Sequence, residues 1–221
     1  MCLHQLERFK EAITEFEIAK DIYSETADPF AAYVALCLGR CFMQLEEHED
    51  ALKNHKESIE RRQQSSSDLK TDTELASFHF YVGLCLYQLE RLKEAIADFE
   101  IAKDIYTEID DPKVEDVAVC LGHCFTQLET HEEDLKNYKE SIERRQHLSN
   151  ELKTDSELAS FHSYAGACLF QLERFKEAIT EFEIAKDIYN EIDDPLPASV
   201  ANCLGKCFKQ LEEHEDSVKN W

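Results

Sequence analysis

Three pairs of cysteines have a spacing that places two thiols on one face of a helix. They share the pattern Cys-x-x-x-Cys and are Cys37/Cys41, Cys120/Cys124 and Cys203/Cys207. With a nearby histidine such as His123, such thiols could ligate a metal. A zinc site needs four converging ligands, however, and no second pair follows at a suitable distance. We therefore expect reduced thiols that pack as small apolar side chains, with no metal and no other cofactor.

No other group of residues predicts catalysis. The sequence has no nucleophile–base pair, no glycine-rich phosphate loop and no carboxylate pair outside a repeating pattern. We predict that the chain is not an enzyme and that its many Asp and Glu side chains form a solvated face.

Composition limits the partners and the setting. The 221 residues are 43% hydrophobic and carry 24 Lys and Arg against 47 Asp and Glu, a formal charge of −23. Such a surface repels nucleic acid and anionic membrane, so we expect neither as a partner. The N-terminal residues lack a signal-peptide pattern, and the nine cysteines indicate a reducing compartment. We expect a cytoplasmic location.

Long repeats organise the chain. The segment 5–23 recurs letter for letter at 171–189, and with three changes at 88–106. Within this period of 83 residues, spacings of 39 and 44 alternate, which predicts two kinds of helical hairpin. We expect hairpins at 29–70, 71–111, 112–153 and 154–194, with partial hairpins at 1–28 and 195–221. This arrangement suggests a fragment of a longer array.

Local signals mark the helix boundaries. Each hairpin is expected to turn at a Leu-Glu-X sequence. Asp-Pro pairs at 28–29, 111–112 and 194–195 predict an N-cap residue followed by proline in the first turn. The segments 71–74 and 154–157 have the pattern of a capping box.

A recurring glycine indicates where helices cross. All five glycines, Gly39, Gly83, Gly122, Gly166 and Gly205, occupy one repeat position inside the first helix of a hairpin. Glycine costs a helix about 1 kcal/mol relative to alanine, so this position implies close helix packing. An alanine, an aromatic residue and another small residue follow at fixed intervals, as in Gly83, Ala95, Phe99 and Ala102. Asp134 and Ser217 occupy the alanine position in two hairpins.

This pattern resembles the tetratricopeptide repeat, in the extended form found in kinesin light chains and Pins-type proteins. The resemblance implies an all-α fold, a right-handed superhelical solenoid of antiparallel hairpins. His79 and His162 replace a large aromatic residue of the motif. The resemblance also implies that one face of the first helices lines a concave groove that binds peptides.

The residues expected to line this groove share the helix face opposite the glycines and carry almost no acid. They are Leu36, Arg40, Met43, Gln44, Phe80, Leu84, Tyr87, Gln88, His123, Thr126, Gln127, Phe170, Gln171, Lys206, Lys209 and Gln210. We expect the amides either to bond a peptide backbone or to cap the helix ends.

We predict a non-catalytic scaffold whose partner is a protein or peptide with an amphipathic segment. Its apolar residues would meet the aromatic side chains, and its acidic end would lie near Lys206 and Lys209. One alternative is a structural spacer that self-associates end to end. Another is an accessory repeat region of a larger enzyme or signalling protein.

Overall fold

The computed structural model describes residues 3–25, 28, 30–65, 72–148, 156–192 and 198–219. All secondary structure in these residues is helical, which confirms the predicted all-α class. The chain divides into two compact units, Met1–Cys124 and Phe125–Trp221.

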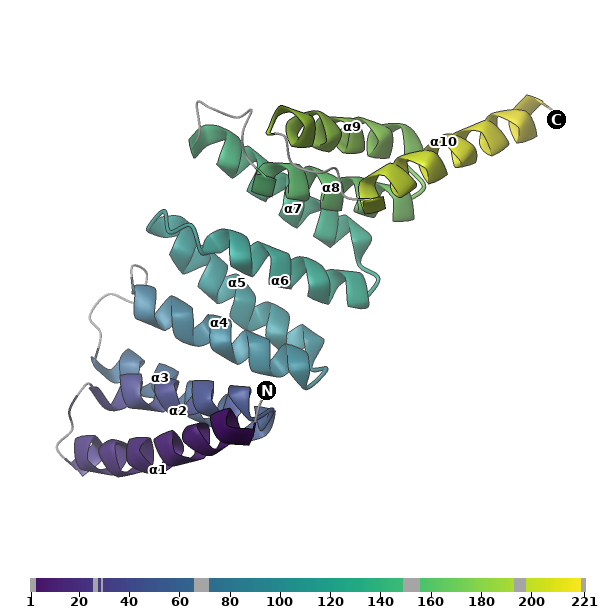
Figure 1. Ribbon diagram of the computed structural model, residues 1–221. Coiled ribbons are helices and arrows are strands. Elements are labelled where there is room, and N and C mark those ends of the chain that lie inside the picture. The colour runs from purple at the N-terminus through teal and green to yellow at the C-terminus, as the bar shows by residue number, and fades with distance from the viewer. Residues whose placement is uncertain are drawn as a thin grey trace. The chain divides into compact units, whose positions relative to one another are not determined.

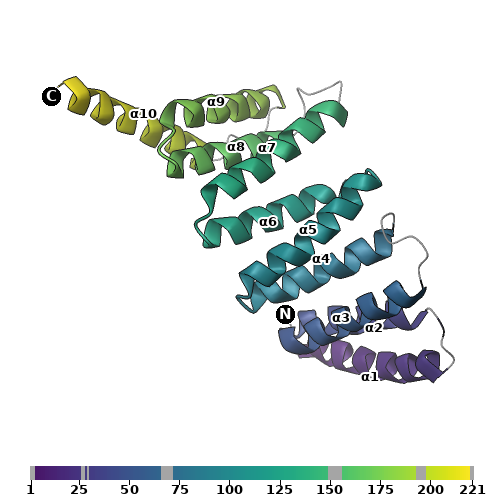
Figure 2. The ribbon, with the colours of Figure 1, turned by 180° about the vertical axis from the view of Figure 1, so that it is seen from behind.

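Unit 1 contains α1 (Leu3–Glu25), α2 (Phe30–Gln44), α3 (His48–Ser65), α4 (Thr73–Gln88), α5 (Leu92–Glu108) and most of α6 (Val114–Gln127). From α1 to α5, each helix packs against the next in the chain. Figures 1 and 2 show these helices side by side from two directions. Within unit 1, α2 with α3 and α4 with α5 form the antiparallel hairpins that the repeat pattern predicts.

Unit 2 contains the end of α6 followed by α7 (His131–Leu148), α8 (Ser156–Gln171), α9 (Phe175–Glu191) and α10 (Ala198–Lys219). Here α7 packs on α8, α8 packs on α9, and α10 packs on both α8 and α9. The third copy of the repeated segment, residues 171–189, therefore forms the turn and second helix of the α8–α9 hairpin.

Four of the five glycines are buried, as predicted: Gly39, Gly83, Gly122 and Gly166. A Cβ atom added at Gly83 would lie 2.6 Å from Cδ1 of Phe99, and one at Gly166 would lie 2.9 Å from Cε1 of Phe182. Each glycine thus leaves room for the aromatic ring of its own second helix. The alanines beside these rings, Ala95 and Ala178, are fully buried.

The predicted Leu-Glu-X turns form inside the array, and their glutamates adopt left-handed backbone conformations. Glu46, Glu90, Glu129 and Glu173 have φ between 56° and 62°. After α4, the N–H of Arg91 donates to the carbonyl of Leu86 at 2.9 Å, and the N–H of Glu90 donates to that of Tyr87 at 3.0 Å. This is the Schellman arrangement, which satisfies the last carbonyls of a helix.

The helix starts follow the predicted signals with one shift. The N–H groups of Phe30 and Lys113 donate to Oδ1 of Asp28 and Asp111 at 2.8 and 2.9 Å, so both aspartates act as caps. In the segment 71–74, the N-cap is Asp72, whose Oδ1 accepts from the N–H of Leu75 at 3.0 Å. The capping-box prediction was therefore wrong by one residue. The pair at 194–195 and the first half of the segment 154–157 lie outside the described residues.

The two terminal helices differ from the prediction because they do not turn. Helices α1 and α10 both run through their Leu-Glu-X sequences, at residues 6–8 and 211–213, without a break. A non-glycine residue in the left-handed region costs about 1–2 kcal/mol. In the interior hairpins, the packing of one helix on the other offsets this cost. Gly205 is consequently exposed, with nothing within 4 Å of an added Cβ, and its predicted burial was wrong.

Candidate functional site

Unit 1 contains a pocket that includes part of the predicted groove. Its volume is about 570 Å³, and it lies between the first part of α1, the second half of α2 and the middle of α4. The lining residues are Phe9, Phe16, Cys37, Arg40, Cys41, Met43, Gln44, Tyr81 and Leu84. Four of them, Arg40, Met43, Gln44 and Leu84, were predicted as groove residues. Among these lining residues only Arg40 is charged.

Tyr81 connects the pocket to the hydrophobic core. Its ring stacks on the imidazole of His55 with centroids 5.3 Å apart, and the guanidinium of Arg40 lies 5.7 Å from its centroid. His55 is fully buried, and its ring nitrogens have no hydrogen-bond partner. Burial, with a smaller effect of the positive charge of Arg40, lowers the pKa of His55 from 6.5 to about 4. The ring behind the pocket is therefore neutral at pH 7.

Sequence reasoning missed Tyr81 because the residues at its repeat position alternate between cysteine and tyrosine. Cys37 and Cys120 were assigned to packing, which hid the tyrosines at the same position. Tyr164 in unit 2 repeats the arrangement, since its ring stacks on Tyr138 with centroids 5.0 Å apart. The recurrence of tyrosine at this position in both hairpins 71–111 and 154–194 was the signal in the sequence.

Two predicted groove residues in unit 1 belong to the core instead. Leu36 is buried in α2. Phe80 is half-buried and its ring lies 5.9 Å from that of Phe99, on the side that faces α5. Both residues lie closer to the second helix of their hairpin than the pocket-lining residues of the same first helix do. Tyr87 is half-buried.

The glutamines that were predicted to line the groove are mostly exposed, and so are the other predicted groove residues of α6. Gln44, Gln88, Gln127 and Gln171 stand exposed at the ends of their helices, and Gln210 is half-buried. His123 is exposed as well. Thr126 has an internal partner, because its Oγ1 donates to Oδ2 of Asp134 at 2.7 Å.

In unit 2, the predicted aromatic and basic residues occupy different surroundings. The ring of Phe170 is half-buried and packs edge-on against Phe175 at a centroid distance of 5.5 Å. Lys206 and Lys209 are exposed on α10. Both kinds of side chain are thus accessible to a partner at least in part.

Asp134 occupies the close-packed alanine position of its hairpin and is almost fully buried, with 1% of its surface exposed. Besides the hydroxyl of Thr126, it lies beside the thiol of Cys168. Burial raises the pKa of Cys168, and the negative charge and hydrogen bond of Asp134 raise it further. A hydroxyl and a thiol thus contact the carboxylate at this close-packed position.

Two buried histidines bridge the helices of their hairpins. Nδ1 of His79 lies 2.7 Å from Oδ1 of Asp98, and Nδ1 of His162 lies 2.6 Å from Oε2 of Glu181. The histidines take the place of the motif's aromatic residue, and the hydrogen bonds satisfy buried polar atoms that would otherwise be costly. Asp98 and Glu181 were predicted to belong to a solvated face, and that prediction was wrong.

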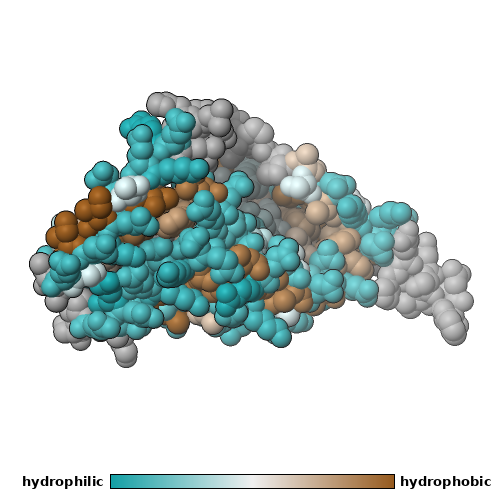
Figure 3. Space-filling view, turned by 90° about the horizontal axis from the view of Figure 1, so that it is seen from below, coloured by the Kyte–Doolittle hydropathy of each residue, from teal (hydrophilic) through white to brown (hydrophobic). Residues whose placement is uncertain are grey.

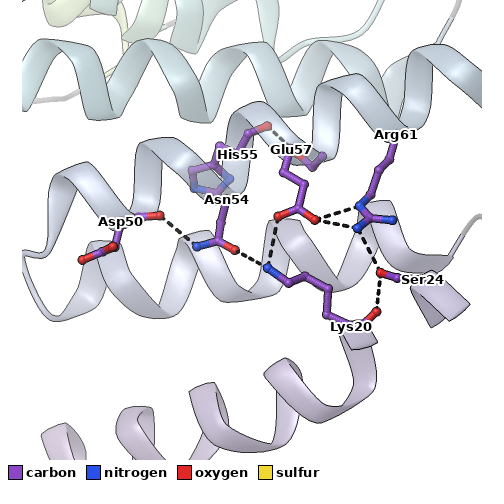
Figure 4. A network of polar contacts seen from close by, with 8 residues as sticks. Lys20, Ser24, Asp50, Asn54, His55, Glu57 and Arg61 are labelled. Carbon is purple, nitrogen blue, oxygen red and sulfur yellow. Dashed lines mark hydrogen bonds and ion pairs between the residues drawn. The ribbon is translucent and has the colours of Figure 1, made fainter. Parts of the chain in front are cut away.

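A polar network joins α1 to α3 (Figure 4). Nζ of Lys20 lies 3.0 Å from Oε2 of Glu57, and Arg61 binds Oε1 of the same carboxylate through Nε and a terminal nitrogen at 2.9 and 2.7 Å. Burial by itself raises the pKa of Glu57, but the hydrogen bonds from Arg61 and Lys20 outweigh it and hold the pKa below 4.5. Second helices of successive hairpins are thus linked in unit 1.

The thiols have the properties of core side chains. Burial raises the pKa of Cys85 and Cys124 to about 12 and that of Cys120 to about 11, and it also raises the pKa of Cys37 and Cys41. Thiolate is the form that binds metals and attacks electrophiles, so these groups are poorly suited to either role. In the described parts of the chain, no three His, Cys, Asp or Glu side chains converge as metal ligands would.

On the face seen in Figure 3, hydrophobic patches interrupt a mostly hydrophilic surface. None of the helices in the described residues has the length and apolar composition needed to cross a bilayer.

Comparison with solved structures identifies the fold as a tetratricopeptide-like repeat. The chain is similar to BtubC (BKLC) from P. vanneervenii, with 18% identity over 96% of this chain and 85% of the other, and a TM-score of 0.69. It is also similar to a putative kinesin light chain with nearly identical TPR-like repeats from Podosopora anserina. That match has 11% identity over 83% and 88% of the two chains, and a TM-score of 0.69.

A Rap protein complexed with competence and sporulation factor matches at 17% identity over 99% of this chain and 65% of the other, with a TM-score of 0.53. No protein-family model and no curated protein matches the sequence significantly. The likeness at these identities concerns the fold.

Proposed function

We propose that the chain is a non-catalytic scaffold that binds protein or peptide segments on the face formed by the first helices of its hairpins. The observation that carries this proposal is the pocket of unit 1. The whole chain has a formal charge of −23, yet the residues that line the pocket include one cation and no acid. A merely solvated face would have its share of Glu and Asp.

The lining residues define the chemistry of the ligand. Met43 and Leu84 offer apolar surface, while Tyr81 offers a ring that is already fixed by stacking on His55. Rigid aromatic side chains lose little entropy on binding, and they are common at binding hot spots. A volume of about 570 Å³ lies within the range of small ligand sites. It suits one or two apolar side chains of a peptide.

Arg40 determines which residues should flank that apolar side chain. It stands exposed at the pocket and carries the single charge among the lining residues. A carboxylate next to the inserted side chain would pair with this guanidinium. In unit 2, Lys206 and Lys209 favour an acidic segment in the same way. The proposed partner is therefore an amphipathic segment that combines apolar and acidic residues.

The solved structure of a Rap protein is a complex with competence and sporulation factor. A binding role for the present chain agrees with that example of the fold.

A displayed library of random peptides tests the proposal. The full chain is the bait, and enriched peptides are then titrated against Leu84→Ala and Arg40→Glu. We expect Leu84→Ala to speed dissociation, because it removes apolar contact. We expect Arg40→Glu to slow association and to change its salt dependence, because charge steers encounter. Lys93→Glu, an exposed position on α5, is the matched charge control.

The proposal requires that the enriched peptides contain an apolar residue beside an acidic one and lose affinity with both pocket variants. Peptides that bind both variants as well as the unaltered chain would show that the pocket is not the site. Failure to enrich any peptide would contradict the binding role itself.

A further inference from the structure

Helix α2 begins with two aromatic residues that face solvent, Phe30 and Tyr33, which we call the aromatic pair. Phe30 has 58% of its surface exposed and Tyr33 has 49%. The two rings pack edge-on with centroids 5.8 Å apart, and the ring of Phe30 also lies 5.8 Å from that of Tyr23 on α1. Phe30 is thus held by its neighbours although more than half of its surface is open to water.

The exposure of the aromatic pair belongs to its position in the repeat. Phe30 and Tyr33 lie nine and six residues before Gly39. At these two positions the hairpins of α4, α6 and α8 carry only charged residues or serines, which are Glu74 and Ser77, Lys113 and Asp116, and Glu157 and Ser160. The first residue of each of these pairs is exposed, and the second is exposed or half-buried. Both positions therefore face water inside the array as well, so the aromatic pair is not part of a hydrophobic core.

The aromatic pair continues the face of α2 that lines the pocket. With 3.6 residues per turn, Phe30, Tyr33, Cys37, Cys41 and Gln44 lie on one side of the helix. The last three of them line the pocket. Burial raises the pKa of the Cys37 thiol, and a hydrogen bond with the side chain of Tyr33 opposes this increase, so Tyr33 reaches the edge of the pocket. The pocket and the aromatic pair form one face along α2.

This face lacks negative charge. None of the 15 residues of α2 is acidic, whereas the whole chain has 47 Asp and Glu. The first helices α4, α6 and α8 each have an acidic residue in the first turn. The single charge of α2 is Arg40. Exposed aromatic side chains on a face of this kind are typical of a binding surface, and the charge of the face favours an acidic partner.

We propose that the aromatic pair is a second anchor site for the amphipathic segment that binds the pocket, so that the partner lies along α2 and places two apolar residues on this face. The inference rests on the proposed function, and it adds the direction of the bound segment and the spacing of its apolar residues.

The length of α2 determines this spacing. Seven to ten residues separate the aromatic pair from Arg40, which corresponds to roughly 10–15 Å along the helix. An extended segment covers about 13 Å in four residues, and side chains four residues apart point to the same side of it. We therefore expect an extended partner with two apolar residues four positions apart and an acidic residue beside the one in the pocket.

Two double variants replace the aromatic pair by residues that other hairpins carry at the same positions. Phe30→Glu with Tyr33→Ser copies α4, and Phe30→Lys with Tyr33→Asp copies the hairpin of α6. Because the interior hairpins contain these residues, both variants should keep their helices, as circular dichroism would show. The first variant adds one negative charge and the second adds no net charge, so an effect common to both comes from the lost aromatic surface. Ile101→Ser, which removes an apolar side chain that is 42% exposed on α5, is the matched control.

Peptides enriched on the unaltered chain are titrated together with forms in which alanine replaces one of the two apolar residues. Each alanine peptide should bind the unaltered chain about tenfold or more weakly. Both double variants should also weaken the original peptide by about tenfold, and on them the alanine at one apolar position should have no further effect. Alanine at the other apolar position should have the same relation to Leu84→Ala. Ile101→Ser should bind like the unaltered chain.

Double variants that bind the peptides as tightly as the unaltered chain, while Leu84→Ala weakens them, would overturn the second anchor and leave the pocket as the site. A loss confined to the variant with Phe30→Glu would also overturn it, because charge would then be the cause. So would enriched peptides without two apolar residues four positions apart. Peptides that bind equally well to both pocket variants would instead contradict the proposed function, and this inference with it.

Discussion

Replacing the glycines one at a time by alanine tests the helix packing, because the four positions with known surroundings leave different amounts of room. At Gly205 a Cβ would meet nothing within 4 Å. At Gly166 it would lie 2.9 to 3.1 Å from the ring of Phe182. At Gly83 it would lie 2.6 Å from Cδ1 and Cε1 of Phe99. Phe99 is fully buried, so its ring has little freedom to move away.

Two opposing effects set the magnitudes. Alanine favours a helix over glycine by about 1 kcal/mol. Overpacking a close-packed interface costs about 1–3 kcal/mol. Gly205→Ala gains the first without the second and should stabilise its helix by about 1 kcal/mol. Gly83→Ala incurs both, so its net effect should be a destabilisation of up to about 2 kcal/mol. Gly166→Ala should fall between them.

Urea unfolding followed by circular dichroism measures the three variants, and hydrogen exchange of the α4 and α5 amides localises the effect of Gly83→Ala. Adding Phe99→Leu to Gly83→Ala should recover part of the loss relative to Phe99→Leu alone, because the bulk that opposes the Cβ is gone. If Gly83→Ala stabilised the protein as much as Gly205→Ala, the close approach of α4 and Phe99 would be refuted.

Two further predictions concern single residues. The folded protein keeps His55 neutral down to about pH 4, whereas the unfolded chain takes up a proton near pH 6.5. Stability should therefore fall as the pH is lowered through this window, by up to about 3 kcal/mol. His55→Phe should remove that part of the dependence, as urea midpoints at pH 7 and pH 5 would show. Glu90→Gly should stabilise by about 0.5–1 kcal/mol in the same assay, because Glu90 has a φ of 57°. Glu212→Gly is the matched control. Glu212 is the glutamate of a Leu-Glu-X sequence that lies within the unbroken helix α10, so glycine there should destabilise the protein by about 1 kcal/mol.

The sequence predicted the features that depend on local chemistry and on the repeat. The spacing from Gly83 to Phe99 identified a contact between helices, because residues that recur together at a fixed phase must share an environment. The Leu-Glu-X sequences marked the turns correctly at Glu90 and Glu173. Asp28 and Asp111 predicted their own helix starts, since an N-cap acts on backbone groups within two or three residues.

Contacts that depend on the register between two helices were beyond the sequence. His79 and Asp98 are 19 residues apart, and only the packing of α4 on α5 brings their side chains together. The recurrence of tyrosine at the position of Tyr81 is visible in the sequence, but its place in the pocket depends on the packing of α1 and α2. In unit 1, Arg40, Met43, Gln44 and Leu84 of the predicted groove residues line the pocket, whereas Leu36 is buried and the ring of Phe80 packs near that of Phe99.

The terminal helices show where the stability of such an array originates. Phe16 and Phe182 belong to identical stretches of 19 residues, yet Phe182 is buried to 99% while Phe16 is half-buried. The difference comes from the neighbouring helix alone, since the local sequence is the same. Fully burying a phenylalanine side chain contributes about 1.5–3 kcal/mol. In the interior hairpins this free energy is gained where a first helix packs on a second helix, so the stability of the array lies in the contacts between helices rather than in each helix alone.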